Sequence, residues 1–200
     1  MNQPTSSLPP LRVSHWFNTP GPIVLDALPG RVVVVHAFQM LCPACVVHGL
    51  PQIAKVRETF PIDQVVVIGL HTVFEHHSVM GVDALKAFIH EYGLRMPIGV
   101  DEADPKGSLP RTMAAWDLQG TPSLVLFDRN GALRLKHFGV LDDMALGAVI
   151  GQLVAQPVPP RALGVDDRQE ADACSDQGCK PISSRPSSAA APPAGPGTTP

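Results

Sequence analysis

Apolar runs and stretches of helical spacing alternate along the chain, and this alternation predicts an α/β fold. The runs at 32–38, 64–70 and 123–127 consist almost entirely of apolar residues. Uninterrupted apolar runs of this length are typical of strands buried on both faces of a sheet. Between and after the first two runs, apolar residues three to four positions apart predict helices over about 43–60 and 83–92.

Shorter signals predict the remaining elements. Pro51 should kink or split the first helix, and Asp83 is placed to cap the second. The turn at 128–131 (Asp-Arg-Asn-Gly) predicts a hairpin from the third strand into 132–138. We also expect a strand at 23–25, an extended piece at 96–100, a helix at 112–117, and a helix from Asp142-Asp143 to about 154. This order of elements predicts an α/β sandwich with a mixed central sheet.

The two ends of the chain differ in composition from its middle. Residues 1–21 are rich in Pro, Ser, Asn and Thr and are interpreted as an arm, whose end Trp16 and Phe17 anchor on the body. Residues 22–155 carry the periodic elements and form the predicted domain. In 156–200 this periodicity stops, and the last twenty residues hold six prolines and no aromatic residue. Such a tail cannot bury a core and is predicted to be disordered.

Charge and composition exclude several classes of function. The net charge is −3, so neither nucleic acid nor an anionic membrane surface is an expected partner. The first residues show no signal peptide, and no apolar run reaches the roughly 18 residues typical of a membrane span. A cytoplasmic location is therefore expected. In that compartment, four cysteines that include a C-x-x-C pair are typical of redox or metal chemistry rather than structural disulfides.

The C-x-x-C pair is Cys42-Pro43-Ala44-Cys45, and it lies where the first buried strand ends and the first helix begins. Pro43 suits the first helical turn, because it has no amide hydrogen to lose there and its φ is preset. Free backbone N–H groups and the positive end of the helix dipole stabilise a thiolate at this position. This position favours a thiolate at Cys42 and predicts redox catalysis by the pair, with metal binding and inert thiols as the alternatives.

Two other clusters contain groups that bind metals or react. One is a C-x2-C-x2-H spacing that suits zinc or copper, formed by Cys42, Cys45 and His48. Three histidines after the second strand could add to it: His71, His76 and His77. We expect no metal site, because two adjacent histidines on a regular segment cannot point at one ion. Cys174 and Cys179 form either a second dithiol that relays electrons or two incidental thiols.

The segment 71–77 follows the second strand, and ligands in open α/β folds bind beyond the carboxyl ends of the strands. The C-x-x-C pair should lie at the same edge. His71 and Glu75 are therefore candidates for moving protons to or from Cys45 or for shaping access to it. The alternative is a solvated loop or a helix-capping segment.

The order of elements, with the C-x-x-C pair after the first buried strand and Gly120-Thr121-Pro122 before the hairpin, resembles the thioredoxin superfamily. Within it, the chain looks most like the redoxin branch, between membrane-tethered thiol–disulfide oxidoreductases and the alkyl hydroperoxide reductase/thiol-specific antioxidant group. The resemblance covers about 22–155. It implies a thioredoxin-like three-layer sandwich and no cofactor.

The resemblance also implies roles for individual residues. Cys42 would attack a disulfide and Cys45 would resolve the mixed intermediate, while Pro122 matches the family's cis-proline, which with Thr121 docks the partner. Many members carry a buried carboxylate six residues before the first cysteine, where this chain has His36. His36 is either a proton acceptor for the second thiol or a hydrogen-bonded core histidine.

The predicted function is a thioredoxin-like thiol–disulfide oxidoreductase that reduces or exchanges protein disulfides. Its partners would be a disulfide-containing protein or small disulfide and an upstream thiol reductant. One alternative is a thiol-dependent peroxidase, although Gln39 replaces the threonine that peroxiredoxins place three residues before their reactive cysteine. Another is a non-catalytic metal-binding or redox-regulated module. The candidate site residues are Cys42 and Cys45 for catalysis, Thr121 and Pro122 for docking, and His36, His71 and Glu75 for a proton relay.

Overall fold

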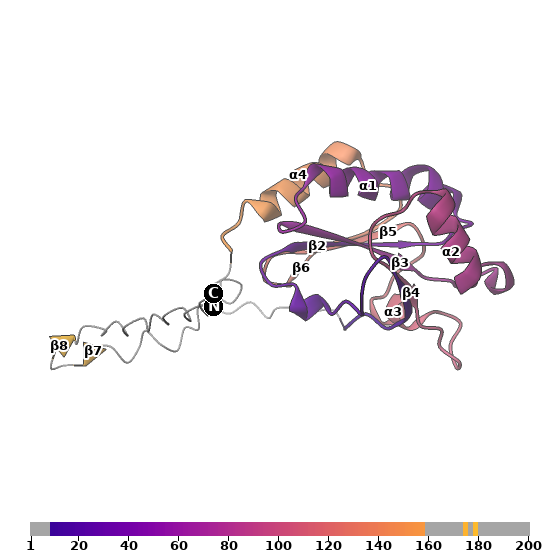
Figure 1. Cartoon of the computed structure of the whole chain (residues 1–200), viewed down its shortest axis with the longest axis horizontal. Coiled ribbons are helices and arrows are strands. Elements are labelled where there is room, and N and C mark those ends of the chain that lie inside the picture. Colours follow the sequence, from indigo (N-terminus) through magenta and orange to yellow (C-terminus); the bar gives the residue numbers. More distant parts are fainter. Residues whose placement is uncertain (1–8, 159–173, 176–177, 180–200) are drawn as a thin grey trace, which may run out of the picture. The chain divides into compact units, whose positions relative to one another are not determined.

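The computed structural model describes residues 9–158, 174–175 and 178–179. Residues 9–158 contain a six-stranded mixed sheet with the strand order β1-β4-β3-β2-β5-β6 (Figure 1). β2, β3 and β4 run parallel, and β1, β5 and β6 are antiparallel to their neighbours. The strands are β1 (Val13–Phe17), β2 (Val32–Phe38), β3 (Val65–His71), β4 (Ile98–Asp101), β5 (Ser123–Phe127) and β6 (Leu133–Phe138).

Helices cover both faces of this sheet, which confirms the predicted three layers. α1, α2 and α4 contribute buried residues to the core on one face, and α3 contributes to the core on the other. The helices are α1 (Leu50–Thr59), α2 (Val82–Glu91), α3 (Arg111–Ala115) and α4 (Asp143–Val154), with the short turns η1 (Leu25–Ala27), η2 (Cys45–Gly49) and η3 (His77–Val79).

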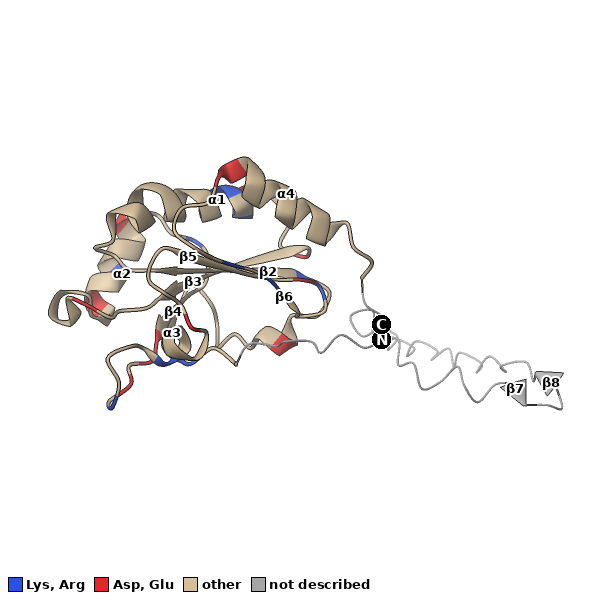
Figure 2. Ribbon diagram, turned by 180° about the vertical axis from the view of Figure 1, so that it is seen from behind, with Lys and Arg blue, Asp and Glu red and all other residues tan. Residues whose placement is uncertain are grey.

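The central strands are apolar because both of their faces are buried. All seven residues of β2 and all seven of β3 are buried. Their side chains alternate between the two cores: Val32 and Val34 face α1 and α4, whereas Val33 and Val35 face α3. Charged residues lie mainly on helices and loops (Figure 2), and β2, β3 and β5 contain no Lys, Arg, Asp or Glu.

The amino-terminal part of the domain corrects two predictions. Residues 13–17 belong to the sheet as strand β1 rather than to an arm, because Val13 and Trp16 pack over Gly99 of β4, which has no side chain in the way. The predicted strand at 23–25 is wrong. Its last residue instead begins η1, which is held by local hydrogen bonds such as that from the Leu28 N–H to the Leu25 carbonyl.

The starts of α4 and α2 are capped differently, and the predicted cap at Asp83 is wrong. Asp142 caps α4, since its carboxylate accepts hydrogen bonds from the N–H groups of Met144 and Ala145 at 2.9 and 3.0 Å. Asp83 does not cap α2. That helix begins one residue earlier, after Gly81, so Asp83 lies inside the first turn, where it makes no cap hydrogen bond.

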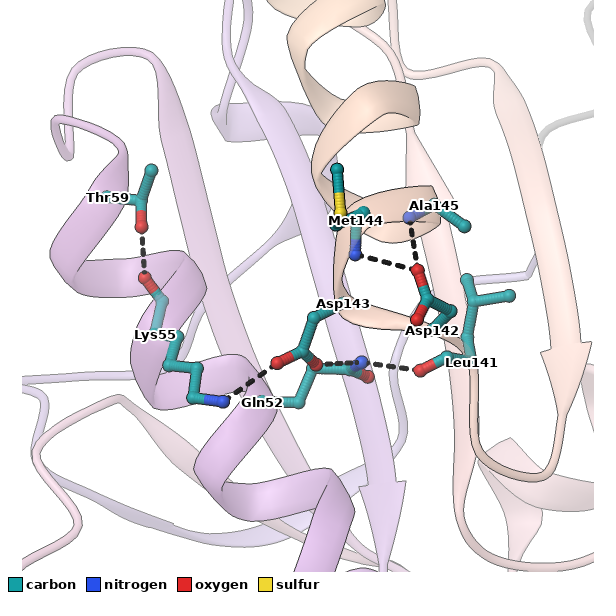
Figure 3. Close-up of polar contacts among 8 residues, drawn as sticks. All are labelled: Gln52, Lys55, Thr59, Leu141, Asp142, Asp143, Met144 and Ala145. Carbon is teal, nitrogen blue, oxygen red and sulfur yellow. Dashed lines mark hydrogen bonds and ion pairs between the residues drawn. The ribbon is translucent and has the colours of Figure 1, made fainter.

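Polar contacts fasten α4 to α1 above the sheet (Figure 3). The Gln52 side-chain amide donates to the Leu141 carbonyl and to Asp143 Oδ1, both at 2.7 Å. Lys55 Nζ lies 2.8 Å from Asp143 Oδ2. Gln52 is buried and so needs these acceptors. The closing helix is therefore tied to the helix that follows the C-x-x-C pair.

Two histidines lie in the core on the α1 face of the sheet. His36 is 1% exposed and His71 is 0% exposed. Neither ring has a hydrogen-bond partner among the described residues. Burial lowers the pKa of each imidazole to about 4, because the low-dielectric interior disfavours the charged form. Both rings are therefore neutral at pH 7.

Within residues 166–200, the structure describes two short antiparallel strands, β7 (Cys174–Ser175) and β8 (Gly178–Cys179), with Cys174 opposite Cys179. Most of the tail predicted to be disordered, 156–200, lies outside the described residues (159–173, 176–177 and 180–200), as do residues 1–8 of the predicted arm. In the part of the chain that the structure describes, no helix is both long and apolar enough to cross a bilayer.

Replacing Asp142 by alanine should lower the free energy of unfolding by about 1 kcal/mol, the usual cost of losing an N-cap. Asp83→Ala is the matched control. It removes an acidic residue from a first helical turn without removing a cap and should cost less than about 0.5 kcal/mol. Urea unfolding at pH 7 measures both, and equal losses would contradict the assignment of the caps.

Acid should destabilise the fold through its buried histidines. The pKa of His71 rises from about 4 to 6.5 on unfolding. The unfolded chain therefore binds a proton between these values that the folded chain does not. The free energy of unfolding therefore has its full value above pH 6.5 and falls as the pH drops towards 4. At pH 4.5 each buried histidine has lowered it by about 2.5 kcal/mol.

The loss of unfolding free energy between pH 7.5 and 4.5 should accordingly be about 2–3 kcal/mol smaller in His71→Leu than in the wild type. His90→Leu removes an exposed histidine and should leave the loss unchanged. An equal loss in His71→Leu and wild type would show that this imidazole is not held neutral.

Candidate active site

The sheet topology brings three loops to one edge. β2 and β3 are parallel, so both end at this edge, where Phe38 of β2 lies opposite His71 of β3. β5 is antiparallel to β2 and therefore begins there, with Ser123 opposite Ala37. The segments after β2, after β3 and before β5 are those in which the sequence predicted site residues. The sheet thus gathers Cys42, Glu75 and Pro122 at the same edge.

The two thiols of the C-x-x-C pair are in contact and are free. The Cys45 S–H donates to Cys42 Sγ, with 2.6 Å between the sulfur atoms, and the Cys45 backbone N–H donates to the same sulfur at 3.3 Å. Both donors favour negative charge on Cys42. Cys42 is partly exposed, whereas Cys45 is fully buried. Only the first sulfur can therefore meet a large partner.

Burial also makes the two thiols chemically different. The pKa of Cys45 rises to about 12, first because burial disfavours the thiolate and second because its S–H is hydrogen-bonded to Cys42. Cys45 is therefore protonated at neutral pH. The buried thiol cannot attack until it loses that proton.

The helix after the pair starts with an unusually wide turn. η2 is a π-helical turn that closes with a hydrogen bond from the Leu50 N–H to the Cys45 carbonyl, and α1 begins at Leu50. Pro51 has no N–H with which to continue the ordinary ladder to Val47. The helix is not split at Pro51: helical backbone runs without a break from 43 to 59, and the π turn η2 lies just before the proline.

Thr121 and Pro122 lie directly beside the reactive sulfur. The peptide bond between them is cis, and the Thr121 carbonyl lies 3.5 Å from Cys42 Sγ. The Gly139 N–H donates to the Pro122 carbonyl at 2.8 Å and so ties this loop to the end of β6. The structure thus brings together four of the predicted residues: Cys42, Cys45, Thr121 and Pro122.

His36 lies under η2. A Cβ placed at Gly49 would overlap the His36 ring, at 2.6 Å from Nε2, and would lie 3.5 Å from Pro122 Cβ. Because Gly49 has no side chain, η2 can pack directly on the imidazole ring of His36. His36 is a core histidine, as one of its two readings had it, but neither ring nitrogen has a hydrogen-bond partner among the described residues.

The other two relay candidates are placed differently. The ring of His71 packs against Phe38, with 5.3 Å between ring centroids. Glu75 is exposed, and its Oε1 lies 3.4 Å from Nε2 of the buried Gln39. The Gln39 carbonyl also accepts from the Cys42 N–H at 3.2 Å. Gln39 thus fastens the loop after β3 to the loop that carries the thiols.

The structure does not assemble the metal cluster that the histidines suggested. Among residues 9–158 and the two short strands beyond them, no three His, Cys, Asp or Glu side chains come together in a way that could hold a metal ion. His48 is exposed on η2, and His76 and His77 are exposed at the start of η3.

Sequence reasoning missed several residues of this edge. Gly49 and Gln39 act through contacts made across the fold. Leu41 and Phe138 are apolar and each 57% exposed. Leu41 precedes Cys42 in the chain, and Phe138 packs over Gly120, next to Thr121 and Pro122. Phe138 ends an alternating strand on its exposed side, which is the one signal that the sequence offered for it.

Comparisons with known proteins agree with this geometry. No protein-family model and no curated protein matches the chain. Among solved structures, a thioredoxin-like superfamily protein is 50% identical with a TM-score of 0.74, over 76% of this chain and 99% of that one. A thiol-disulfide isomerase from Corynebacterium glutamicum is 47% identical with a TM-score of 0.72, over 75% and 97% of the two chains.

A more distant structure shares the fold alone. It is a putative thiol:disulfide interchange protein from Chlorobium tepidum, 21% identical with a TM-score of 0.57, matched over 74% of this chain and 100% of its own. The fold, the C-x-x-C pair at the end of β2 and half identity to a thioredoxin-like protein over almost its full length lead to one conclusion. The chain belongs to the thioredoxin superfamily.

Proposed function

We propose that this protein is a thiol–disulfide oxidoreductase that uses Cys42 and Cys45 to reduce or exchange disulfides of proteins. The observation that carries the proposal is the contact between a partly exposed and a buried thiol, 2.6 Å apart, at the start of η2. Its close relative from Corynebacterium glutamicum is described as a thiol-disulfide isomerase. We also propose that the protein belongs to the redoxin branch of the superfamily and works in the cytoplasm.

The reaction begins at Cys42. Its thiolate attacks one sulfur of the partner's disulfide, a new bond forms between Cys42 Sγ and that sulfur, and the other partner sulfur leaves as a thiolate that takes up a proton. The N–H and S–H of Cys45 both point at Cys42 Sγ and stabilise its negative charge before the attack.

The second step belongs to Cys45. After losing its proton, Cys45 attacks Cys42 Sγ, the Cys42–partner bond breaks, and the partner's second sulfur leaves reduced. The protein ends with a Cys42–Cys45 disulfide, and an upstream thiol reductant must supply two electrons to restore the dithiol. Run in reverse, the same steps oxidise or rearrange a partner's disulfides.

Docking is proposed to use the loop before β5. The Thr121 carbonyl beside Cys42 is a backbone acceptor for an extended partner segment. Pro122 holds this loop against η2. Leu41 and Phe138 give the edge an exposed apolar surface, which suits the unfolded or flexible segments that expose protein disulfides.

With Cys42→Ser, dithiothreitol should reduce insulin no faster than it does without the protein, because the attacking sulfur is gone. Cys45→Ser should instead accumulate a covalent mixed disulfide, visible by mass spectrometry and released by excess thiol. Both variants are best made with Cys174 and Cys179 replaced by serine. A fully active Cys42→Ser protein, or consumption of peroxide faster than of disulfide by the wild type, would contradict the proposal.

Phe138→Ser should raise KM for a protein disulfide about tenfold, since burying an aromatic ring contributes about 1–2 kcal/mol. The reaction with hydroxyethyl disulfide should be unchanged, because so small a molecule does not reach the ring. Ile62→Ser, which removes a 69% exposed side chain before β3 at the opposite edge of the sheet, is the control. Equal effects of the two substitutions would show that Phe138 has no docking role.

A further inference from the structure

We propose that a cavity at the edge of the sheet opposite the redox pair binds a small organic anion through its carboxylate or phosphate group, and that Arg129 is the charged contact. The site is separate from the thiol chemistry. β2 begins and β5 ends at this edge, whereas Cys42 follows the other end of β2. The length of β2 therefore puts roughly 20 Å between the cavity and the thiols.

Two segments enclose the cavity: η1 with the turn that follows it, and the hairpin turn between β5 and β6. The cavity has a volume of about 270 Å³, and its lining includes Leu25, Leu28 and Pro29 from the first segment and Arg129 from the second. The Gly30 N–H donates to the Arg129 carbonyl at 3.0 Å and joins the two segments. Both walls are fixed to the sheet, because one segment leads into β2 and the other leaves β5.

The side chain of Arg129 is buried without an opposite charge. The residue is 9% exposed, and its Nε has no hydrogen-bond partner among the described residues. No Asp or Glu of residues 9–158 forms an ion pair with it. Arginine is almost never this buried unless it is paired, because an unpaired charge in the interior loses its hydration without compensation. A guanidinium offers two parallel donors that match a carboxylate or a phosphate, so a bound oxyanion would supply the opposite charge.

The carboxylates nearby do not supply this charge. Asp128 is buried, but its Oδ1 accepts two backbone N–H groups of the turn at 2.8 and 3.0 Å, and its Oδ2 is paired with Arg134 Nε at 2.6 Å. Asp26 lines the cavity, but it is exposed and forms no ion pair with Arg129. Solvent therefore screens the charge of Asp26, whereas the charge of Arg129 stays unbalanced.

A second arginine adds positive charge to this edge. Arg31 lines a smaller cavity that shares Leu25, Asp26 and Leu28 with the first. It is partly buried, and it too forms no ion pair with a described residue. Two arginines against one exposed carboxylate attract anions, and the two leucines provide an apolar wall. The site therefore fits an organic anion whose oxyanion contacts Arg129 and whose apolar part lies against the leucines.

The test uses the full-length, reduced protein and follows its backbone amide shifts by NMR at constant ionic strength. The probes are phenyl phosphate and benzoate, which share an aromatic ring, together with inorganic phosphate and the neutral benzyl alcohol. Both aromatic anions should shift the amides of Gly30, Asn130 and Gly131 saturably, with a Kd of about 1 mM. Benzyl alcohol should bind about tenfold more weakly, because it brings no charge to Arg129.

Four variants test the contacts. Arg129→Gln should weaken the binding of both aromatic anions about tenfold, and Arg129→Lys, which keeps the charge without the paired donors, should weaken it less. Asp26→Asn removes the one negative charge that lines the cavity without a partner and should tighten binding about two- to threefold. Arg57→Gln, which removes an exposed arginine of α1, is the matched control and should leave binding unchanged.

The outcomes decide the proposal and the ligand class. Tighter binding of phenyl phosphate would support the site and identify a phosphate ester, and tighter binding of benzoate would support it and identify a carboxylate. No saturable shift with any anion, or equal binding in Arg129→Gln and Arg57→Gln, would overturn it. Because Asp26 is exposed, Asp26→Asn remains informative even if Arg129→Gln does not fold, and weaker anion binding in it would contradict the site. None of these results bears on Cys42 and Cys45.

Discussion

Burial of β2 on both faces is the constraint on which the rest of the structure depends. Every residue from Val32 to Phe38 is buried, with one set of side chains under α1 and α4 and the other over α3. A shift of one residue would exchange the two sets, so the register is strongly specified. Because the strand is fixed, its end is fixed, and Cys42 is held at the edge where β3 ends and β5 begins.

The same burial divides the chemistry between the two thiols. Cys42 emerges at the edge, while Cys45, one helical turn on, is covered completely. The interior that stabilises the fold keeps Cys45 protonated and both core histidines neutral. In the proposed reaction, a partner therefore meets Cys42 first, and Cys45 acts only when its proton is removed. The order of the two proposed steps follows from the depth at which each thiol lies.

Much of this could be predicted from the sequence, because the signals are local. Signals such as the buried run 64–70 and the turn at 128–131 act within a few residues. The predictions that failed depend on partners distant in sequence. β1 is a strand because Gly99 of β4 leaves room for Val13 and Trp16, and Asp83 is no cap because α2 starts after Gly81. The same distinction holds for the site. The C-x-x-C pair can be recognised in the sequence, whereas the contact of Gly49 with His36 exists only once helix and sheet pack.

The central claim is that Cys42 and Cys45 form one two-electron couple. Its most direct test is the redox state of the pair across a series of thiol/disulfide buffers, read by thiol trapping and mass spectrometry. The account predicts a single transition to a Cys42–Cys45 disulfide, within the range of about −270 to −120 mV known for such proteins. The position of the midpoint indicates whether the protein works as a reductase or as an oxidant. A pair that forms no disulfide at any potential would contradict the account.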